Sequence, residues 1–378
     1  VEFYASVGAI EDTNSSNDQD VSIISGEVKG IESHWEDKVI YSYVTIFVTG
    51  VEKGQASLKN REIVIKHLGG GVDSFAMWRS DQPTFHIGEK ARLRIREAMG
   101  RFVLVKGAQG KTSLESGIQS IEGRTVAGYK LFWFRPPGEW ATSTSRPGPD
   151  WYGPARWNDA DIPVEYYIDT NGTPSGIAES AFIEYAQKCY QSWEDDPGSY
   201  IDYSYAGTRS DAAFGDNDGV NIFCWKDIDG SGGTLGLCNI WVSYTPGSYD
   251  SLKITDSDAA LDNGDGWSAA TTCPPDMLDV QNIGTHEVGH NVGLTDLYDS
   301  GDSEMTMYGY GSLGETKKRT LEWGDIAGIN FIYPTSGLYV PVLISPANGA
   351  MVSTTPTLQW GSFAGATFYM PEVWDGST

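Results

Sequence analysis

The sequence predicts a multidomain protein with an N-terminal small β-barrel of the OB-like type, a central α/β domain and the start of a C-terminal Ig-like β-sandwich. Three observations support this prediction. Short alternating apolar runs separated by turn residues fill the first 120 residues. Segments with helical and with extended periodicity then alternate as far as residue 335. Beyond residue 335, strand-like runs return among prolines and glycines.

Residues 1–120 are predicted to form the barrel, as an accessory domain. The triple glycine Gly69–Gly71 marks one of the turns between its strands. Five strands in about 100 residues suit a small closed barrel such as an OB-like fold. The predicted strands are Val21–Val28, Val39–Val48, Glu62–His67, Ala91–Arg96 and Arg101–Lys106.

Residues 121–162 follow as a linker rich in proline and tryptophan. Proline discourages regular structure, whereas the large tryptophan side chain gains from burial. We therefore expect an irregular strap that lies against the next domain and holds the barrel close to it.

The central domain, residues 163–335, is predicted to alternate strands with helices. Apolar residues recur every four positions from Ile177 to Trp193, as they do on one face of a helix. Pro334 ends the last predicted helix. The predicted strands are Pro163–Ile168, Tyr200–Tyr205 and Val220–Trp225, and the predicted helices are Ile177–Trp193, Asp279–Leu294 and Thr320–Tyr333.

Residues 336–378 resemble the first strands of an Ig-like or fibronectin-like sandwich. Such a sandwich needs about 100 residues, so we expect the natural chain to continue into further β domains. The alternative is a short β tail packed on the central domain. The strand-like runs are Pro341–Gly349, Thr357–Trp360 and Ala366–Val373.

The net charge of −25 is unevenly distributed along the chain. Residues 1–120 carry −2 and residues 121–378 carry −23. So large an acidic part repels phosphate, which disfavours nucleic-acid binding. We expect some of these carboxylates to bind cations and the others to form a solvated surface. No apolar stretch of about 20 residues is present, so no membrane span is predicted.

The four cysteines all lie in the acidic part, and none forms a C-x-x-C pair, which disfavours a cysteine zinc site. An even number of cysteines in a secreted chain favours two disulfides, with three possible connectivities. We prefer Cys224–Cys238, which closes a short loop, and this choice leaves Cys189–Cys273. A valine at position 1 fits a processed or trimmed chain, and with two glycosylation sequons it agrees with a secreted, extracellular protein.

The segment from Gly284 to Asp296 contains HEVGH, the zinc-binding pattern H-E-x-x-H. On a helix, His286 and His290 leave the same face, so two ring nitrogens reach one tetrahedral ion. Glu287 stands next to the first ligand, placed to accept a proton from water activated by the metal. The pentapeptide alone is equally compatible with an amphipathic helix that carries two hydrogen-bonded histidines and a surface glutamate.

Asp296 is the predicted third zinc ligand. Gly293 breaks the helix, because glycine tolerates left-handed backbone angles, and the chain then swings Asp296 toward the metal. The other three histidines of the chain lie far upstream, and none follows His290. A carboxylate is an acceptable zinc ligand, so zinc is the expected metal.

A second acidic segment is a candidate for structural calcium. Its aspartates alternate with glycine, asparagine and other residues, and hard oxygen ligands on a flexible loop suit calcium. The alternative is a solvated turn, which acidic glycine-rich loops often form. The candidate ligands are Asp216, Asp218, Asp227 and Asp229.

The extended motif resembles the metzincin clan of zinc peptidases, in which H-E-x-x-H-x-x-G-x-x-H is followed by a methionine turn. Met305-Thr-Met-Tyr-Gly-Tyr310 supplies the turn, with Met307 as its methionine. Residues from about 160 to 335 look most like the matrixin branch of the clan. Asp229–Gly236 is similar to its calcium-binding loop, Met277–His286 to the start of its zinc helix and Gly324–Tyr333 to its closing helix.

The resemblance implies an α/β metzincin catalytic domain and a zinc-dependent endopeptidase that acts on proteins or peptides. It implies one catalytic zinc, Glu287 as the general base and Met307 as an apolar floor under the metal. Tyr308 and Tyr310 are candidates for stabilising the developing oxyanion, and a packing role is the alternative for each.

The sequence departs from the matrixin pattern in ways that change the expectations. Asp296 stands where the usual third histidine lies. Residues 87–285 contain no histidine, so a second, structural zinc is not expected. No cysteine precedes Cys189, so the cysteine switch of matrixin pro-segments is absent. We therefore expect the 1–120 domain to pack beside the protease and to leave the zinc open to water.

Two other functions compete with the secreted zinc endopeptidase. The first is a catalytically silent metzincin-like scaffold that acts as an extracellular binding or structural protein. The retention of Glu287 together with His286 and His290 favours the enzyme instead. The second is a gluzincin-type peptidase whose third ligand is a distant glutamate, such as Glu315 or Glu322. Gly293, Asp296 and the methionine turn argue against it.

Overall fold

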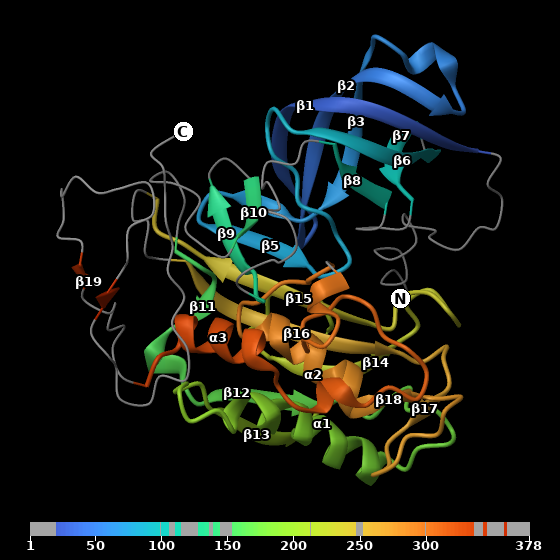
Figure 1. The fold of residues 1–378 in the computed structure, drawn as a ribbon. Coiled ribbons are helices and arrows are strands. Elements are labelled where there is room, and N and C mark those ends of the chain that lie inside the picture. Colours follow the sequence, from blue (N-terminus) through green and yellow to red (C-terminus); the bar gives the residue numbers. More distant parts are fainter. Residues whose placement is uncertain are drawn as a thin grey trace.

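The computed structural model describes residues 20–98, 100–105, 110–114, 128–135, 139–143, 153–211, 213–246, 252–298, 300–335, 343–345 and 359–360. Figure 1 shows the N-terminal strands in blue above a larger sheet that carries the helices. Among the described residues, no helix is long and apolar enough to cross a membrane.

Six strands from the first 120 residues form one sheet in the order β1-β2-β3-β7-β6-β8. β1 pairs with β6 as well as with β2, so the pairings lead through β2, β3, β7 and β6 back to β1. This ring of pairings supports the OB-like barrel, which stays a prediction. The strands are β1 (Val21–Glu36), β2 (Val39–Lys53), β3 (Glu62–Leu68), β6 (Lys90–Ala98), β7 (Arg101–Leu104) and β8 (Lys111–Ser113), and a 3-10 turn covers Ala56–Leu58.

The N-terminal sheet has an apolar core of its own. Alternate residues of its strands face inward, as the period of two in the sequence predicted. The fully buried members include Ile24, Val44, Ile65, Leu93 and Ile95. The five predicted strands are therefore present, although β1 continues to Glu36, well beyond the predicted end at Val28.

The central sheet has the order β13-β12-β14-β16-β15-β5-β4. Its first four strands are parallel, and β15 runs antiparallel to β16. The sequence did not predict β15 or β16. The strands are β12 (Val164–Ile168), β13 (Tyr203–Thr208), β14 (Ile222–Lys226), β15 (Gly236–Ser243) and β16 (Lys253–Asp262), with β11 (Arg156–Trp157) paired to β16.

The last two strands of the central sheet come from the first 120 residues. β5 (Phe75–Arg79) pairs antiparallel with β15, and β4 (Gly70–Val72) pairs with β5. Figure 1 shows β5 beside β15, between the N-terminal sheet and the helices. The central sheet therefore crosses the domain boundary predicted at residue 120.

Three α-helices complete the central part: α1 (Glu179–Glu194), α2 (Val280–Asn291) and α3 (Trp323–Ile332). α1 and α2 pack against each other on one face of the central sheet (Figure 1). Trp193 of α1 is fully buried, and its indole nitrogen donates to the Thr285 carbonyl of α2 at 2.8 Å. α3 starts three residues later than predicted, because Glu322 and Asp325 form a reciprocal capping box at its N-terminus.

The described part of the predicted strap docks on the central domain. Leu131 and Trp157 are buried in the central core, and the Trp157 indole donates to the backbone and side-chain oxygens of Asn291. Most of residues 121–152 lies outside the described residues. The remaining short elements are β9 (Leu131–Arg135), β10 (Glu139–Ser143), β17 (Trp267–Ser268), β18 (Leu278–Asp279) and 3-10 turns at Asp159–Asp161, Ser300–Asp302 and Lys317–Arg319.

Beyond residue 335, the structure describes two short strands, β19 (Leu343–Ser345) and β20 (Gln359–Trp360), which pair antiparallel. The other residues of the predicted Ig-like segment lie outside the described part. The Ig-like sandwich is therefore not confirmed and stays a prediction.

The expected disulfides do not form in the structure, where all four cysteines are buried free thiols. Cys224 of β14 pairs with Ala260, and Cys238 of β15 pairs with Ala259, on opposite sides of β16. Two strand spacings amount to about 10 Å, beyond the Cα separation of about 7 Å that a disulfide tolerates. The two side chains also belong to different apolar clusters. The predicted Cys224–Cys238 disulfide is therefore wrong, although the two cysteines are close along the chain.

Cys189 and Cys273 also lie in separate surroundings. The Cys189 thiol on α1 contacts the Tyr185 carbonyl at 3.1 Å, whereas the Cys273 thiol contacts the Met277 carbonyl at 3.4 Å. Burial raises the pKa of both thiols. The second predicted pair is therefore wrong as well.

Candidate metal centre

Helix α2 begins and ends at positions fixed by specific contacts. Asp279 caps its N-terminus, accepting a hydrogen bond from the Asn282 amide at 2.8 Å. At the other end, Gly293 adopts a φ of 100°, and an added Cβ would lie 2.2 Å from the Ala155 carbonyl oxygen. Only glycine fits there, so the chain reverses after the helix and returns Asp296 to the face that carries His286 and His290.

The structure brings together the three residues that the sequence proposed as zinc ligands. One ligand atom from each of His286, His290 and Asp296 lies within 4.8 Å of the others. The Asp296 Oδ1 atom is 3.0 Å from the His286 Nε2 atom and 3.7 Å from the His290 Nε2 atom. Among the described residues, this is the single group of three or more His, Cys, Asp or Glu side chains that could hold a metal ion.

The hydrogen bonds of the two rings orient them for metal binding. The His286 Nδ1 atom donates to the Thr306 carbonyl at 2.7 Å, and the His290 Nδ1 atom donates to the Leu294 carbonyl at 2.9 Å. With the proton on Nδ1, each Nε2 lone pair is directed toward Asp296. Tetrahedral ligands at zinc bond lengths stand about 3.3 Å apart, close to the separations above. The N₂O donor set therefore fits zinc with a fourth position left for water or substrate.

The charges at the centre also suit a cation. Burial would raise the pKa of Asp296, but the charges of His290 and His286 lower it to about 2. Burial lowers the pKa of His290 to about 4. At neutral pH the aspartate is therefore ionised and His290 is neutral, and these are the forms that bind a metal ion.

Glu287 points to the same centre from the neighbouring position of α2. It is 4% exposed, and an added Cβ on Gly236 of β15 would lie 2.6 Å from its Oε1 atom. Its Oε2 atom is buried without a hydrogen-bond partner among the described residues. Burial, followed by the charge of Asp296, raises the pKa of Glu287 well above its ordinary value. A buried carboxylate with an unused acceptor is chemically suited to bind a water or a substrate group.

Met307 lies beneath the helix that carries the two histidines. It is fully buried, and an added Cβ on Gly289 would lie 2.2 Å from its sulfur. The fourth residue of HEVGH is therefore a glycine because the methionine packs directly against the helix.

Asp325 of α3 is a site residue that the sequence reasoning missed. Its buried carboxylate accepts hydrogen bonds from the amides of Thr306 and Met307, at 2.8 and 3.1 Å. Thr306 in turn provides the carbonyl that orients His286. A chain of hydrogen bonds thus connects α3 to a candidate zinc ligand. The only sequence signal was the capping pattern of Glu322 and Asp325.

Tyr298 is the second residue that the sequence reasoning missed. Its hydroxyl donates to the Asp296 Oδ2 atom at 3.1 Å, which leaves Oδ1 turned toward the histidines. The candidates Tyr308 and Tyr310 lie nearby, since the Tyr310 ring stands 5.4 Å from that of Tyr298 and 5.5 Å from that of Tyr308. Tyr310 is 48% exposed and thus accessible from solvent. The oxyanion role stays a prediction for both.

The four aspartates proposed for calcium do not converge on one point. Asp216 pairs with Lys38 at 2.6 Å, and Asp218 accepts a hydrogen bond from the Val220 amide at 2.9 Å. Asp229 accepts the Thr234 amide and shares a hydrogen bond with the Asp262 carboxyl group. Asp227 is exposed. Calcium therefore stays a prediction.

The glutamates of the gluzincin alternative are engaged elsewhere. Glu315 accepts a hydrogen bond from the Asn282 side chain at 3.1 Å, and Glu322 caps α3. Neither belongs to the group of metal-binding side chains.

Residues 156–334 match the family model of the matrixins. This segment is a matrixin domain. The sheet-rich α/β fold agrees with that family, and the matrixin resemblance of the sequence is confirmed for this segment. A search of curated proteins finds no match to the chain.

Membership in the family has a direct consequence for function. Matrixins are zinc-dependent endopeptidases, so the domain is assigned to hydrolases that cleave proteins or peptides. The match begins at Arg156 and therefore includes β11, which the predicted boundary at residue 163 had left in the strap.

Proposed function

We propose that the protein is a zinc endopeptidase in which His286, His290 and Asp296 hold the metal and Glu287 is the general base. One observation supports this most strongly. Three oriented donor atoms converge beside a buried carboxylate that has an unused acceptor oxygen. The matrixin match over the same residues supplies independent support.

Each residue has a distinct task in the proposed reaction. His286, His290 and Asp296 would hold zinc, which would supply Lewis-acid chemistry by polarising a peptide carbonyl and lowering the pKa of water. Glu287 accepts a proton from the attacking water and returns it to the departing amine. Tyr298 keeps Asp296 turned toward the metal, and Tyr308 or Tyr310 stabilises the oxyanion.

The silent-scaffold alternative receives less support. A scaffold has no need for a buried carboxylate with an unused acceptor, because burying it costs free energy. Glu287 is held in that state next to three metal-binding side chains. Retaining this arrangement favours catalysis.

Calcium and secretion belong to the proposal as separate parts. The hydrogen bond shared by Asp229 and Asp262 marks the place where a cation would replace a proton between two carboxylates. Disulfides give secretion no support, since the cysteines are free thiols, and this part of the proposal rests on the glycosylation sequons alone.

The proposed function is tested by casein cleavage with purified full-length protein. We expect slow proteolysis that phenanthroline abolishes and that added zinc restores. Proteolysis that persists in excess chelator, or no proteolysis by protein shown to contain one zinc per chain, would contradict the proposal.

A further inference from the structure

We propose that β5 and the residues after it, Phe75–Gln82, cover the substrate-binding edge of the domain and thereby lower the peptidase activity of the full chain. This inference rests on the proposed function, because it assumes that peptides bind beside the metal. It concerns a contact within the chain, between the strands of the first 120 residues and the matrixin domain.

The edge in question belongs to β15, the outermost strand of the matrixin domain. One side of β15 pairs with β16, and the other side pairs with β5 from Asn239 to Ser243. β15 starts beside the catalytic centre, because Gly236 packs against the Glu287 carboxylate. An extended peptide that binds next to the metal would add to this edge through main-chain hydrogen bonds. β5 already occupies that position.

Hydrogen bonds at both ends fix β5 on the edge. The Tyr244 amide donates to the Ser74 carbonyl at 3.0 Å, and the Ser80 amide donates to the Cys238 carbonyl at 2.9 Å. The Ser80 hydroxyl also accepts the Cys238 amide at 2.9 Å. Because hydrogen-bonded pairs alternate along an antiparallel ladder, Trp78 is a hydrogen-bonded partner of β15 as well.

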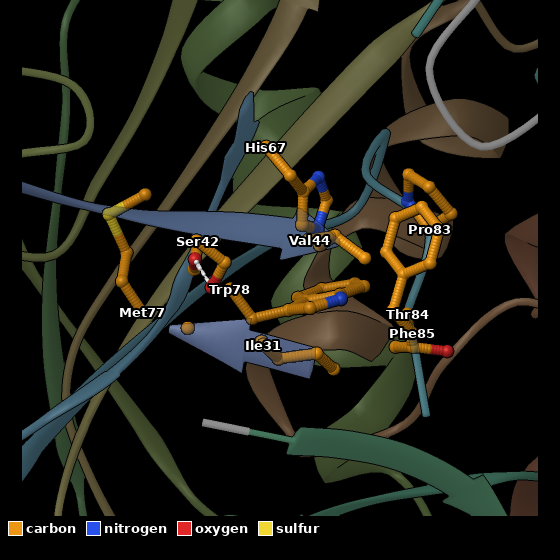
Figure 2. Close-up of a pocket in the computed structure, with 11 residues that line it drawn as sticks. Ile31, Ser42, Val44, His67, Met77, Trp78, Pro83, Thr84 and Phe85 are labelled. Atoms are coloured by element: carbon orange, nitrogen blue, oxygen red, sulfur yellow. Dashed lines mark hydrogen bonds between the residues drawn. The ribbon is translucent and has the colours of Figure 1, made fainter. Parts of the chain in front are cut away.

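Trp78 extends the contact from the edge to the metal centre. It is 5% exposed, and its ring stands at 65° to the His290 ring with the centroids 5.3 Å apart. The same side chain lines a small cavity with Val44, His67 and Phe85 of the N-terminal part (Figure 2). The indole therefore connects the N-terminal part to a proposed zinc ligand. The expectation that the first 120 residues leave the centre open to water stays a prediction, and the present proposal opposes it.

Aromatic contacts on the face of β5 opposite Trp78 also stabilise its position. Trp35 stacks on Trp241 of β15 with the rings 5.6 Å apart and 10° from parallel, and Phe75 packs edge-on against Trp35. The loop after β5 is also held, because the Arg79 guanidinium binds both carboxylate oxygens of Asp81, at 2.6 and 2.7 Å.

Release of the edge requires β5 to separate from β15, which exposes Ala76, Met77 and Trp78 from the apolar clusters that they share with the central domain. β5 pairs with β4 and β15 but is absent from the N-terminal sheet, which has its own buried core. β4 and β5 form a hairpin connected to that sheet through Gly69 and Gly70, whose φ angles are 100° and 129°. Peptide binding and β5 pairing therefore compete for one edge.

A reversible cross-link tests this competition in the full chain. Phe75 and Ser243 face each other at a position without main-chain hydrogen bonds, since the neighbouring pair Ser74–Tyr244 carries them. Cα atoms at such positions stand about 4.5 Å apart, within the range that a disulfide spans. The double variant Phe75→Cys/Ser243→Cys, oxidised with glutathione disulfide and checked by mass mapping, locks β5 in place.

Two readouts are compared before and after reduction. We expect the reduced variant to cleave a short fluorogenic peptide about tenfold faster than the locked form, a change of about 1.4 kcal/mol in barrier. We also expect zinc transfer to the colorimetric chelator pyridylazoresorcinol to be slower from the locked form. Equal values in both states for both readouts would overturn the proposal. If neither state cleaves peptide but zinc transfer still differs, the proposal that β5 covers the edge is supported and the proposed peptidase function is contradicted.

A substitution gives an independent test. Trp78→Ala removes the indole beside His290, so we expect faster peptide cleavage and faster zinc transfer. Val64→Thr, an exposed position on β3 of the N-terminal sheet, is the control and should match the wild type. A folded Trp78→Ala variant with wild-type values in both readouts would contradict the role of the tryptophan. Near-ultraviolet circular dichroism establishes that each variant is folded.

Discussion

The Asp296 carboxylate is the residue that distinguishes this centre from a pair of helical histidines. Its Oδ1 atom faces both rings, and Tyr298 holds its Oδ2 atom. An isolated buried carboxylate would be costly, but two imidazoles and a hydroxyl surround this one. The arrangement is that of a ligand prepared for a cation.

Replacing this ligand should weaken zinc binding. Asp296→Ala removes one of three donors, so we expect zinc affinity to fall by at least the tenfold to 100-fold seen for changes outside the ligand set. Glu304→Ala, which removes an exposed carboxylate, is the matched control. Affinity is measured by competition with a chelator of known zinc affinity. Unchanged zinc affinity in a folded Asp296→Ala variant would exclude Asp296 as a ligand.

The elements around the centre are held together by buried carboxylates. Asp325 joins α3 to the methionine turn, and Asp279 caps α2 while it pairs with Arg319. These contacts connect segments that are distant in the sequence. The positions of the proposed zinc ligands thus depend on contacts outside α2 as well as on the helix itself.

Asp325→Asn tests the link between α3 and the turn. The amide has one acceptor oxygen, so one of the bound backbone amides loses its partner, at a cost of about 1–3 kcal/mol. We expect a lower midpoint of urea unfolding and weaker zinc binding, because Thr306 orients His286. Asp276→Asn, an exposed carboxylate, should change neither. A variant with wild-type stability and zinc affinity would show that the link has no role.

The buried aspartates of strand β16 should make the stability of the protein depend on pH. Burial raises the pKa of Asp256 from 3.8 to about 7, and the adjacent Asp258 is raised as well. Between the unfolded pKa of Asp256, 3.8, and its folded pKa, about 7, the folded state binds more protons than the unfolded state. The contribution of Asp256 to stability is therefore lost as pH rises. Asp256→Asn should therefore gain stability relative to the wild type from about pH 4 to pH 7.

The comparison requires urea unfolding of both proteins across that range in calcium-free buffer. The difference in the free energy of unfolding should grow with pH in favour of the variant. Parallel curves would mean that Asp256 is ionised in the folded protein throughout.

Local sequence patterns predicted some elements well. The alternating runs gave the positions of β1, β2, β3, β6 and β7, because one face of each strand is buried in the N-terminal core. The HEVGH segment gave α2, and Gly293 gave its end, because the left-handed turn admits glycine.

Other elements could not be read from local patterns. β16 carries Asp256, Asp258 and Asp262 inward, so its polar composition hid a buried strand. The edge position of β5 depends on its pairing with residues far along the chain. The disulfide prediction failed for the same reason, since Cys224 and Cys238 are close in sequence but separated by a strand. Asp325 and Tyr298 reach the centre only through the tertiary fold.

At the scale of the whole molecule, the N-terminal part and the matrixin domain share a sheet. The nearly neutral residues 1–120 place β4 and β5 on an acidic partner, which holds 23 of the 25 net negative charges. The shared sheet and the stack of Trp35 on Trp241 join the two parts. If β5 covers the substrate-binding edge as proposed, the N-terminal part controls access to the proposed metal site.

The free thiols are a property of the whole fold that is easily measured. All four cysteines are buried, so we expect little reaction of the native protein with Ellman's reagent and four reactive thiols after unfolding without reductant. Fewer than four reactive thiols in the unfolded protein would mean that disulfides form after all.

The central claim is that Glu287 performs catalysis at a zinc ion held by its neighbours. The most direct measurement compares the peptide cleavage rate and zinc content of Glu287→Gln with those of the wild type, in the full chain and in the Trp78→Ala background. Glutamine keeps the shape of the side chain but cannot accept the proton, so kcat/KM should fall by about 10²-fold or more. Zinc should stay at one per chain. Near-normal turnover by the zinc-loaded variant would contradict the account.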